Sequence, residues 1–376
     1  MCAFPLQRPL LPSHYRVLLE PPDDKGDETL TFVSLARRVK LRGHAFREFR
    51  KHVVPLLDGR HEVAQIAAAC SDEFERQDLD DALMLLHEQG LLRDAATEQP
   101  IGDHDARLPQ WNQWHDLGRD PAEVQARLAA ASVAIVGLGG AGAVAAQALA
   151  AAGVGALRLV DNEPVHAADG YLAAVYAGDV DGRVRADVLQ DELSRLSPAL
   201  SVQPQTQPLP DDDAVAAAVQ GTDFVLCCLD DGRSGLAYKL NRVCLRLEMP
   251  WLAAGTAGTE VWVGPLMRPP TTACYLCFRM RLVAAAENPE DAYALSSHLD
   301  RLRRDDSSVH ESLVYGEGIA GQLAALEVTK ALADVPAPAA AGNLVVFDLV
   351  ALSATRHKVL RKPWCPACGS MPWGNG

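Results

Sequence analysis

The sequence predicts an α/β fold preceded by a smaller α+β domain, and three observations support this prediction. A glycine-rich segment, 137–142, separates an apolar strand-like run from an Ala-rich helical run, as in a βαβ unit. Residues 12–93 show short β-rich runs followed by helical periodicity. Two CxxC pairs, far apart in the chain, are spaced like the ligands of one structural metal ion.

Residues 1–93 are predicted to form the smaller, winged-helix-like domain. Short β-rich runs separated by turn residues predict three strands, at Tyr15–Leu19, Thr29–Val33 and Arg38–Arg42. Apolar residues at helical spacing predict three helices, one from Gly43 to the Asp58-Gly59 turn, one around Ile66 and one that ends at Gly90. A linker, residues 94–130, is expected to follow.

Residues 131–376 are predicted to form a Rossmann-like domain. Val133–Val136 reads as a buried strand, Gly137–Gly142 as a tight turn and Ala143–Ala152 as a helix, and the next strand ends at Asp161. Glycines in such a turn let the backbone approach a phosphate at the helix N-terminus, and the acid after the second strand can hold a ribose. This fingerprint alone suits NAD as well as ATP.

A further acidic residue, Asp230, ends the apolar run that begins at Asp223, at the carboxyl end of a strand, where ligands gather in parallel sheets. It is a candidate magnesium ligand. The candidate nucleotide-binding residues are therefore Gly137, Gly139, Gly140, Gly142, Asp161 and Asp230.

The two CxxC pairs, Cys274/Cys277 and Cys365/Cys368, predict a structural zinc site, because four thiolates complete the tetrahedral shell that zinc prefers. Pro366 and Gly369 suit the tight turn of such a pair. The alternative is one or two disulfides, or unpaired cysteines. A shared ion would tie the end of the chain to a distant segment.

Composition narrows the classes of function. The chain has 376 residues, is 48% hydrophobic and carries a formal net charge of −14, which argues against a general nucleic-acid-binding protein. No apolar run is long enough to span a membrane, and the first residues lack the apolar stretch of a secretory signal. Isolated cysteines indicate thiols that stay reduced rather than forming disulfides, so we expect a cytoplasmic protein.

The acidity is uneven along the chain. Residues 31–60 contain eight basic residues against two acidic ones. A basic segment in an acidic chain indicates either an acidic partner, such as a peptide, or a solvated face of the small domain.

The run from Leu41 to Leu92, which includes the segment Val54-Pro-Leu-Leu-Asp-Gly-Arg60, resembles the PqqD-like domain that recognises leader peptides in enzymes modifying ribosomally made peptides. This resemblance implies capture of a leader as an extra strand beside the third strand, an arrangement that an edge strand permits. It implies that Val39 and Leu41 line one wall, and Leu79, Leu83 and Leu86 the other. The alternatives are a DNA-binding winged helix or plain core packing.

The glycine-rich turn, Asp161 and the cysteine pairs together resemble the ThiF/ubiquitin-activating (E1-like) superfamily over residues 130–370. Active members bind MgATP, adenylate a peptide carboxyl terminus and usually form dimers. More narrowly, the segments around Cys274 and Cys365 are similar to the leader-binding, E1-like component of azoline-forming cyclodehydratases. That component serves a YcaO-type ATPase in making thiazole/oxazole-modified peptides.

The chain departs from the active members where their Ser-Asn-x-x-Arg-Gln motif lies. Asp169, Leu172 and Ala173 stand for its Asn, Arg and Gln, and Arg185 stands for a later Lys. Losing the Arg removes a charged donor to phosphate, and Asp in place of Asn adds repulsion. No nucleophilic cysteine lies in the polar segment 282–311, so we expect no catalytic residue in this chain. The glycine turn is then a vestige, a structural turn or a weak nucleotide site.

These observations predict a zinc-containing, homodimeric scaffold that binds a precursor leader and presents the Cys, Ser or Thr residues of its core to a YcaO-type cyclodehydratase, with no nucleic-acid or membrane partner. Holding the leader raises the effective concentration of the core. The main alternative is a self-sufficient enzyme that uses ATP and Mg²⁺ to adenylate a peptide carboxyl group. A winged-helix regulator and a nicotinamide oxidoreductase are more distant alternatives.

Overall fold

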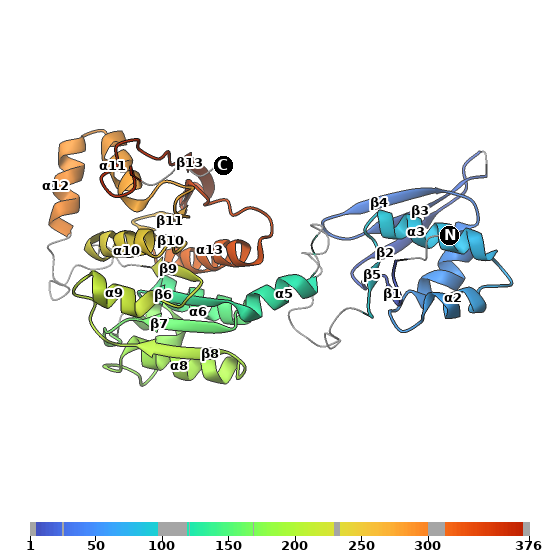
Figure 1. Ribbon diagram of the computed structural model, residues 1–376, viewed down its shortest axis with the longest axis horizontal. Helices are drawn as coiled ribbons and strands as arrows, with labels where there is room; N and C mark the ends of the chain where they lie inside the picture. The colour runs from blue at the N-terminus through green and yellow to red at the C-terminus, as the bar shows by residue number, and fades with distance from the viewer. Residues whose placement is uncertain are drawn as a thin grey trace. The chain divides into compact units, whose positions relative to one another are not determined.

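The computed structural model describes residues 5–24, 26–96, 119, 121–167, 169–228, 234–299 and 313–370. The chain divides into two compact units, Met1–Val124 and Gln125–Gly376 (Figure 1). Each unit is described by itself.

The first unit contains a three-stranded antiparallel sheet with the strand order β2-β3-β4. Its strands are β2 (Arg16–Glu20), β3 (Glu28–Val33) and β4 (Arg38–Gly43). Its helical elements are α1 (Phe46–Glu48), the π-helical turn η1 (Phe49–Val53), the 3-10 turn η2 (Val54–Leu56), α2 (Val63–Ala69) and α3 (Arg76–Glu88). A short antiparallel pair joins β1 (Pro9–Leu10) to β5 (Arg93–Asp94), which follows α3.

The sheet and helices of the first unit share one core. Leu30 and Phe32 on β3 are fully buried, and they pack with Phe49, Ile66 and Leu83 from the helical elements. Leu30 and Phe32 lie on the same face of β3 because residues two apart in a strand share a face. The helix expected from Gly43 is present as the contiguous elements α1, η1 and η2, whose hydrogen bonding changes from α to π to 3-10; Pro55, which lacks an N–H group, lies in the last of them.

The second unit is built on an eight-stranded sheet with the strand order β13-β12-β11-β10-β9-β6-β7-β8 (Figure 1). Strands β10, β9, β6, β7 and β8 run parallel, while β11, β12 and β13 are antiparallel. The sheet is therefore mixed, and its parallel half is Rossmann-like, as the βαβ pattern predicts. The strands are β6 (Ser132–Val136), β7 (Ala156–Val160), β8 (Ser201–Gln205), β9 (Phe224–Cys228), β10 (Trp251–Ala257), β11 (Glu260–Met267), β12 (Asn343–Asp348) and β13 (Ser353–Lys358).

Helices lie on both faces of this sheet. On one face, α9 and α10 pack on Val225 and Cys227 of β9, while α6 and α13 pack against each other and, through α13, on β10 and β11. The helices are α5 (Pro121–Ala130), α6 (Gly140–Ala152), α7 (Asp169–Leu172), the 3-10 turn η3 (Ala174–Tyr176), α8 (Arg185–Leu196), α9 (Asp212–Val219), α10 (Ser234–Arg246), α11 (Tyr275–Ala285), α12 (Pro289–Leu299) and α13 (Val314–Ala333).

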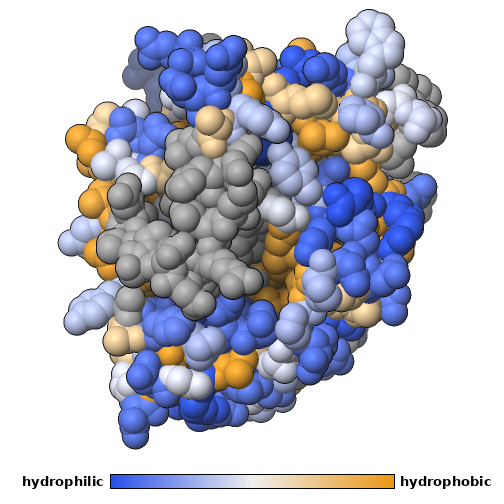
Figure 2. Space-filling model, turned by 90° about the vertical axis from the view of Figure 1, so that its left-hand side faces the viewer, coloured by the Kyte–Doolittle hydropathy of each residue, from blue (hydrophilic) through white to orange (hydrophobic). Residues whose placement is uncertain are grey.

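The surface of the second unit on the side of α9 and α12 interleaves hydrophilic residues with scattered apolar ones (Figure 2). Within the described ranges, no helix combines the length and the apolar composition that crossing a membrane requires.

Candidate functional site

The glycine-rich turn joins β6 to α6, and its glycines are required by packing within the chain itself. A Cβ on Gly142 would lie 1.9 Å from the carbonyl oxygen of Gly137, so any side chain there would force the turn apart. A Cβ on Gly140 would lie 2.7 Å from the Cβ of Glu317 and 2.9 Å from that of Leu172. A glycine pattern typical of phosphate binding therefore has a structural cause at these two positions.

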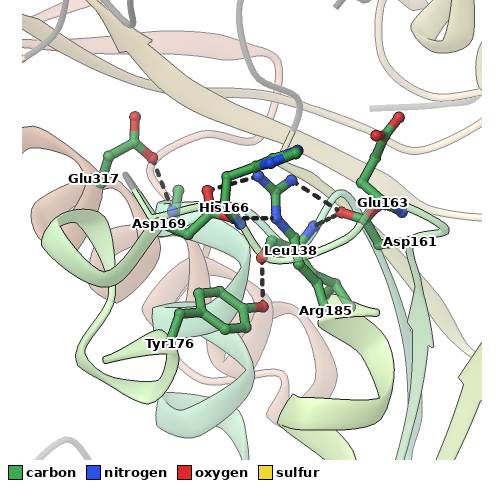
Figure 3. A network of polar contacts seen from close by, with 9 residues as sticks. Leu138, Asp161, Glu163, His166, Asp169, Tyr176, Arg185 and Glu317 are labelled. Carbon is green, nitrogen blue, oxygen red and sulfur yellow. Dashed lines mark hydrogen bonds and ion pairs between the residues drawn. The ribbon is translucent and has the colours of Figure 1, made fainter. Parts of the chain in front are cut away.

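A carboxylate of the chain lies at the N-terminus of α6, where a Rossmann-like fold places a phosphate. Glu317 of α13 accepts a hydrogen bond from the Ala141 backbone N–H at 2.8 Å and another from the Thr256 hydroxyl at 2.6 Å (Figure 3). Its side chain is buried. The helix N-terminus is thus already paired with an anion, and a bound phosphate would compete with it.

Beside this turn, one buried guanidinium lies between two buried carboxylates (Figure 3). Arg185 donates to both oxygens of Asp169, at 2.8 and 2.6 Å, and lies 3.6 Å from Asp161. Asp161 accepts from the backbone N–H groups of Leu138 and Glu163. Both oxygens of the acid predicted to hold a ribose are therefore already engaged by the fold.

The charges of this cluster disfavour a polyphosphate. The carboxylates of Asp161 and Asp169 flank the Arg185 guanidinium, that of Glu317 lies at the N-terminus of α6, and all four side chains are buried. Repulsion between like charges is strong where water is excluded. A cavity of about 160 Å³ remains next to the turn, lined by residues that include Gly137, Asp161 and Asn162.

The departures from the family motif can now be placed in space. Asp169, which stands for an Asn, forms the ion pair with Arg185, and Leu172, which stands for an Arg, packs near Gly140. Tyr176 holds the glycine-rich turn in place, since its hydroxyl donates a hydrogen bond to the Leu138 carbonyl at 2.6 Å. Asp230, the candidate magnesium ligand, lies outside the described residues.

Glu317→Ala is expected to lower the free energy of unfolding by about 2–4 kcal/mol, because the buried N–H of Ala141 and hydroxyl of Thr256 each lose their acceptor. Glu317→Gln keeps an acceptor oxygen and should show less than half of that loss. Denaturant unfolding of both variants measures the difference. Equal losses would show that the two hydrogen bonds do not hold the turn.

The four cysteines of the CxxC pairs lie together and are buried. Their sulfur atoms lie within 4.8 Å of one another, and three pairs are 3.6 to 3.8 Å apart. A tetrahedral ion with Zn–S bonds of about 2.3 Å would separate its sulfurs by about 3.8 Å. The donor set therefore fits a four-thiolate metal site without rearrangement.

Hydrogen bonding and burial act in opposite directions on the thiols of these cysteines. The hydrogen bond from the Cys274 thiol lowers the pKa of Cys277 to about 4, which favours its thiolate, whereas burial raises the pKa of Cys368 to about 11, which opposes its ionisation. The Lys362 N–H also lies 3.3 Å from the Cys277 sulfur. Gly369 is needed because a Cβ there would lie 2.6 Å from the Cys365 carbonyl oxygen, rather than because of a positive φ.

The residues predicted to line a peptide groove in the first unit divide into two groups. Val39 and Leu41 are half-buried on β4, which is an edge strand of the sheet. Leu79, Leu83 and Leu86 of α3 are at most 2% exposed and belong to the core. Helical periodicity identifies an apolar face but does not distinguish a core face from an open groove wall.

Glu317 is a site residue that the sequence patterns do not single out. A signal was present, since it is an acid in a helix of mostly small and apolar residues, Val314–Ala333. Its partner Ala141 is 176 residues away, and nothing local in the sequence predicts that pairing.

Comparison with known proteins agrees with this architecture. The model of the ThiF family matches residues 109–367. The molybdopterin-synthase adenylyltransferase of Salmonella typhimurium is 30% identical over 265 residues, covering 70% of this chain and 98% of that protein. The sulfur carrier protein ThiS adenylyltransferase of Escherichia coli is 30% identical over 245 residues, covering 65% and 88%.

Solved structures resemble the chain over almost its whole length. E. coli MccB, crystallised with MccA-N7isoASN, superposes with a TM-score of 0.72 at 18% identity and covers 96% of this chain and 99% of its own. PaaA superposes with a TM-score of 0.69 at 17% identity, covering 93% and 99%. These likenesses concern the fold, and the family match covers more than half of the sequence. The chain belongs to the ThiF family and has its α/β, Rossmann-like E1 fold.

Proposed function

We propose that this protein is the leader-binding, E1-like partner of a separate YcaO-type, ATP-dependent cyclodehydratase that makes thiazole/oxazole-modified peptides. In this role the chain binds a precursor leader and presents the Cys, Ser or Thr residues of the core. The observation that carries the proposal is the Glu317 carboxylate on the Ala141 N–H, at the position where an adenylating relative needs a phosphate.

The buried ion pair supports the same conclusion. In an adenylating site a cation must be available to the phosphates. Here the Arg185 guanidinium is held by Asp169 in two hydrogen bonds, and breaking a buried pair leaves an uncompensated charge. Several curated relatives are adenylyltransferases, and these contacts explain why this member would leave ATP chemistry to a partner.

The first unit supplies the peptide-binding part of the proposal, as a PqqD-like, winged-helix-like domain. Strand β4 is an edge strand, so among the described residues its outer N–H and C=O groups have no strand partner. An extended peptide can add to such an edge, with main-chain hydrogen bonds giving affinity and alternate side chains giving selectivity. MccB, one of the structural relatives, was solved in complex with N-formylated MccA.

The four cysteines would hold a structural zinc ion, and the protein would act as a homodimer. Cys274 and Cys277 begin α11, while Cys365 and Cys368 follow β13. A shared ion would therefore fix the end of the described chain against α11. In this position the ion contributes stability to the fold, and no step of peptide modification is assigned to it.

Self-sufficient adenylation is the second candidate, because the curated relatives are adenylyltransferases. ATP–pyrophosphate exchange tests the choice. The full chain with MgATP and a Cys/Ser/Thr-rich peptide encoded beside it should show only background exchange. Exchange above background that is lost in Asp230→Ala would overturn the scaffold proposal.

The cyclodehydratase role has a direct positive test. The chain, a YcaO-type protein from the same gene neighbourhood and the precursor peptide are combined with ATP, and the peptide is weighed by mass spectrometry. We expect loss of one water per heterocycle, and a much slower reaction when the chain is left out. Equal rates with and without the chain would contradict the proposal.

A further inference from the structure

The two edge strands of the first unit's sheet, β4 and β2, differ in the charge of their exposed side chains. The side chains of β4 alternate between exposed and half-buried. The exposed positions carry three cations, Arg38, Lys40 and Arg42, whereas the half-buried positions carry Val39 and Leu41. The opposite edge, β2, has Arg16, Leu18 and Glu20 at its exposed positions, which carry no net charge. The two edges would therefore select different guest strands.

The three cations of β4 are not equally engaged. Lys40 pairs with Glu20 at 2.7 Å, and Arg42 pairs with Asp23 and Asp27. These pairs are exposed, and such pairs exchange partners at little free-energy cost. Arg38 forms no hydrogen bond or ion pair with any described residue, and its charge acts only at a distance on Glu20, whose pKa it helps to lower after the hydrogen bond and charge of Lys40.

Helix α3 is anchored at the β4 edge. The neighbouring Arg37 donates hydrogen bonds to the carbonyls of Gln89 and Gly90, just after the end of α3. The half-buried Val39 and Leu41 lie on the face of β4 that packs on the core beside this helix. A strand added next to β4 would place alternate side chains on this apolar side and the others beside the three cations.

Resting on the proposed peptide capture, we infer that the guest of β4 is an extended segment that alternates apolar and acidic residues. Arg38 is the residue of β4 that contributes most to recognition of the acidic side chains. Apolar side chains contact Val39, Leu41 and the adjoining core. Acidic side chains lie opposite Arg38, Lys40 and Arg42. The six residues of β4 set the length of the segment that is read.

Charge complementarity on one face makes this guest distinguishable from others. Opposite charges directly across two strands stabilise the pair, and like charges destabilise it. Three such positions give roughly tenfold preference for an acidic guest over a neutral one of the same apolar pattern. Because these contacts are exposed, the preference should shrink as salt rises to about 0.5 M.

The test uses the full chain and three labelled peptides that alternate Val with Glu, Gln or Lys. Fluorescence anisotropy should rank them Glu, Gln, Lys, with about tenfold between the first two. Arg38→Glu should weaken the Glu peptide about fivefold to tenfold and the Gln peptide less than twofold. Arg16→Glu is the matched control, since Arg16 lies in the same cross-strand row, on the other side of Val33, and it should change neither affinity.

The outcomes separate the two proposals. Equal binding of the Glu and Gln peptides would overturn the acidic guest and leave strand capture standing. Equal effects of Arg38→Glu and Arg16→Glu would overturn the assignment to Arg38 and to the β4 edge. Absence of binding by all three peptides would overturn peptide capture and this inference together. Both substituted residues are exposed, and circular dichroism of each variant confirms folding.

Discussion

Cys365→Ser combined with Cys368→Ser is expected to abolish metal binding and to destabilise the second unit. The wild-type protein should carry about one zinc ion per chain, because four sulfurs are already arranged at the spacing of a tetrahedral site. Two ligands cannot hold a structural ion tightly, and the binding free energy of such an ion is also folding free energy. We expect the free energy of unfolding to fall by at least about 3 kcal/mol, with a melting temperature roughly 6–12 °C lower.

A buried cysteine outside the cluster gives the control for this prediction. Cys244 on α10 is fully buried, and its burial raises the pKa of the thiol to about 12. Because Cys244 is not one of the four grouped cysteines, Cys244→Ala should keep full metal content, measured by inductively coupled plasma mass spectrometry. A chelator should lower the melting temperature of this variant and of the wild type, but not of the double variant. The site would be contradicted if wild-type protein produced with ample zinc contained no metal after purification.

Much of the fold follows from local patterns. The three strands of the first unit lie within one or two residues of their expected limits, because turn residues such as Asp23 and Gly26 bound short alternating runs. The strand, glycine turn and helix at 132–152 also follow from local sequence. Spacing alone predicts the metal site at the cysteine pairs, since four thiols in two CxxC pairs are uncommon without a metal.

The remaining features depend on long-range contacts that no local pattern encodes. The glycine turn gives the same sequence signal whether a phosphate or Glu317 lies at the helix N-terminus, and only the packing of α13 against α6 distinguishes the two cases. The leucines of α3 give the same periodicity in a core as in a groove wall. A variant such as Leu83→Arg would bury a charge in the core of the first unit. Loss of peptide binding in that variant would therefore not distinguish a groove wall from a core position.

Arg185→Met is expected to destabilise the second unit by about 3–5 kcal/mol, because it leaves the carboxylates of Asp161 and Asp169 buried without their cation. Arg183→Met is the matched control two residues earlier. Arg183 pairs with Asp191 at 2.7 Å, but 47% and 65% of the two side chains are exposed, so its removal should change stability by less than about 1 kcal/mol. Denaturant unfolding of both variants compares them directly.

A double substitution distinguishes loss of the ion pair from loss of packing around Arg185. In Arg185→Met with Asp169→Asn, one of the stranded charges is removed together with the cation, so the double variant should be more stable than Arg185→Met alone. Loss of packing instead predicts additive effects, with the double variant less stable than either single one. Additivity would mean that Arg185 is held by shape rather than by charge. The argument that this cation is withheld from phosphates would then lose its physical basis.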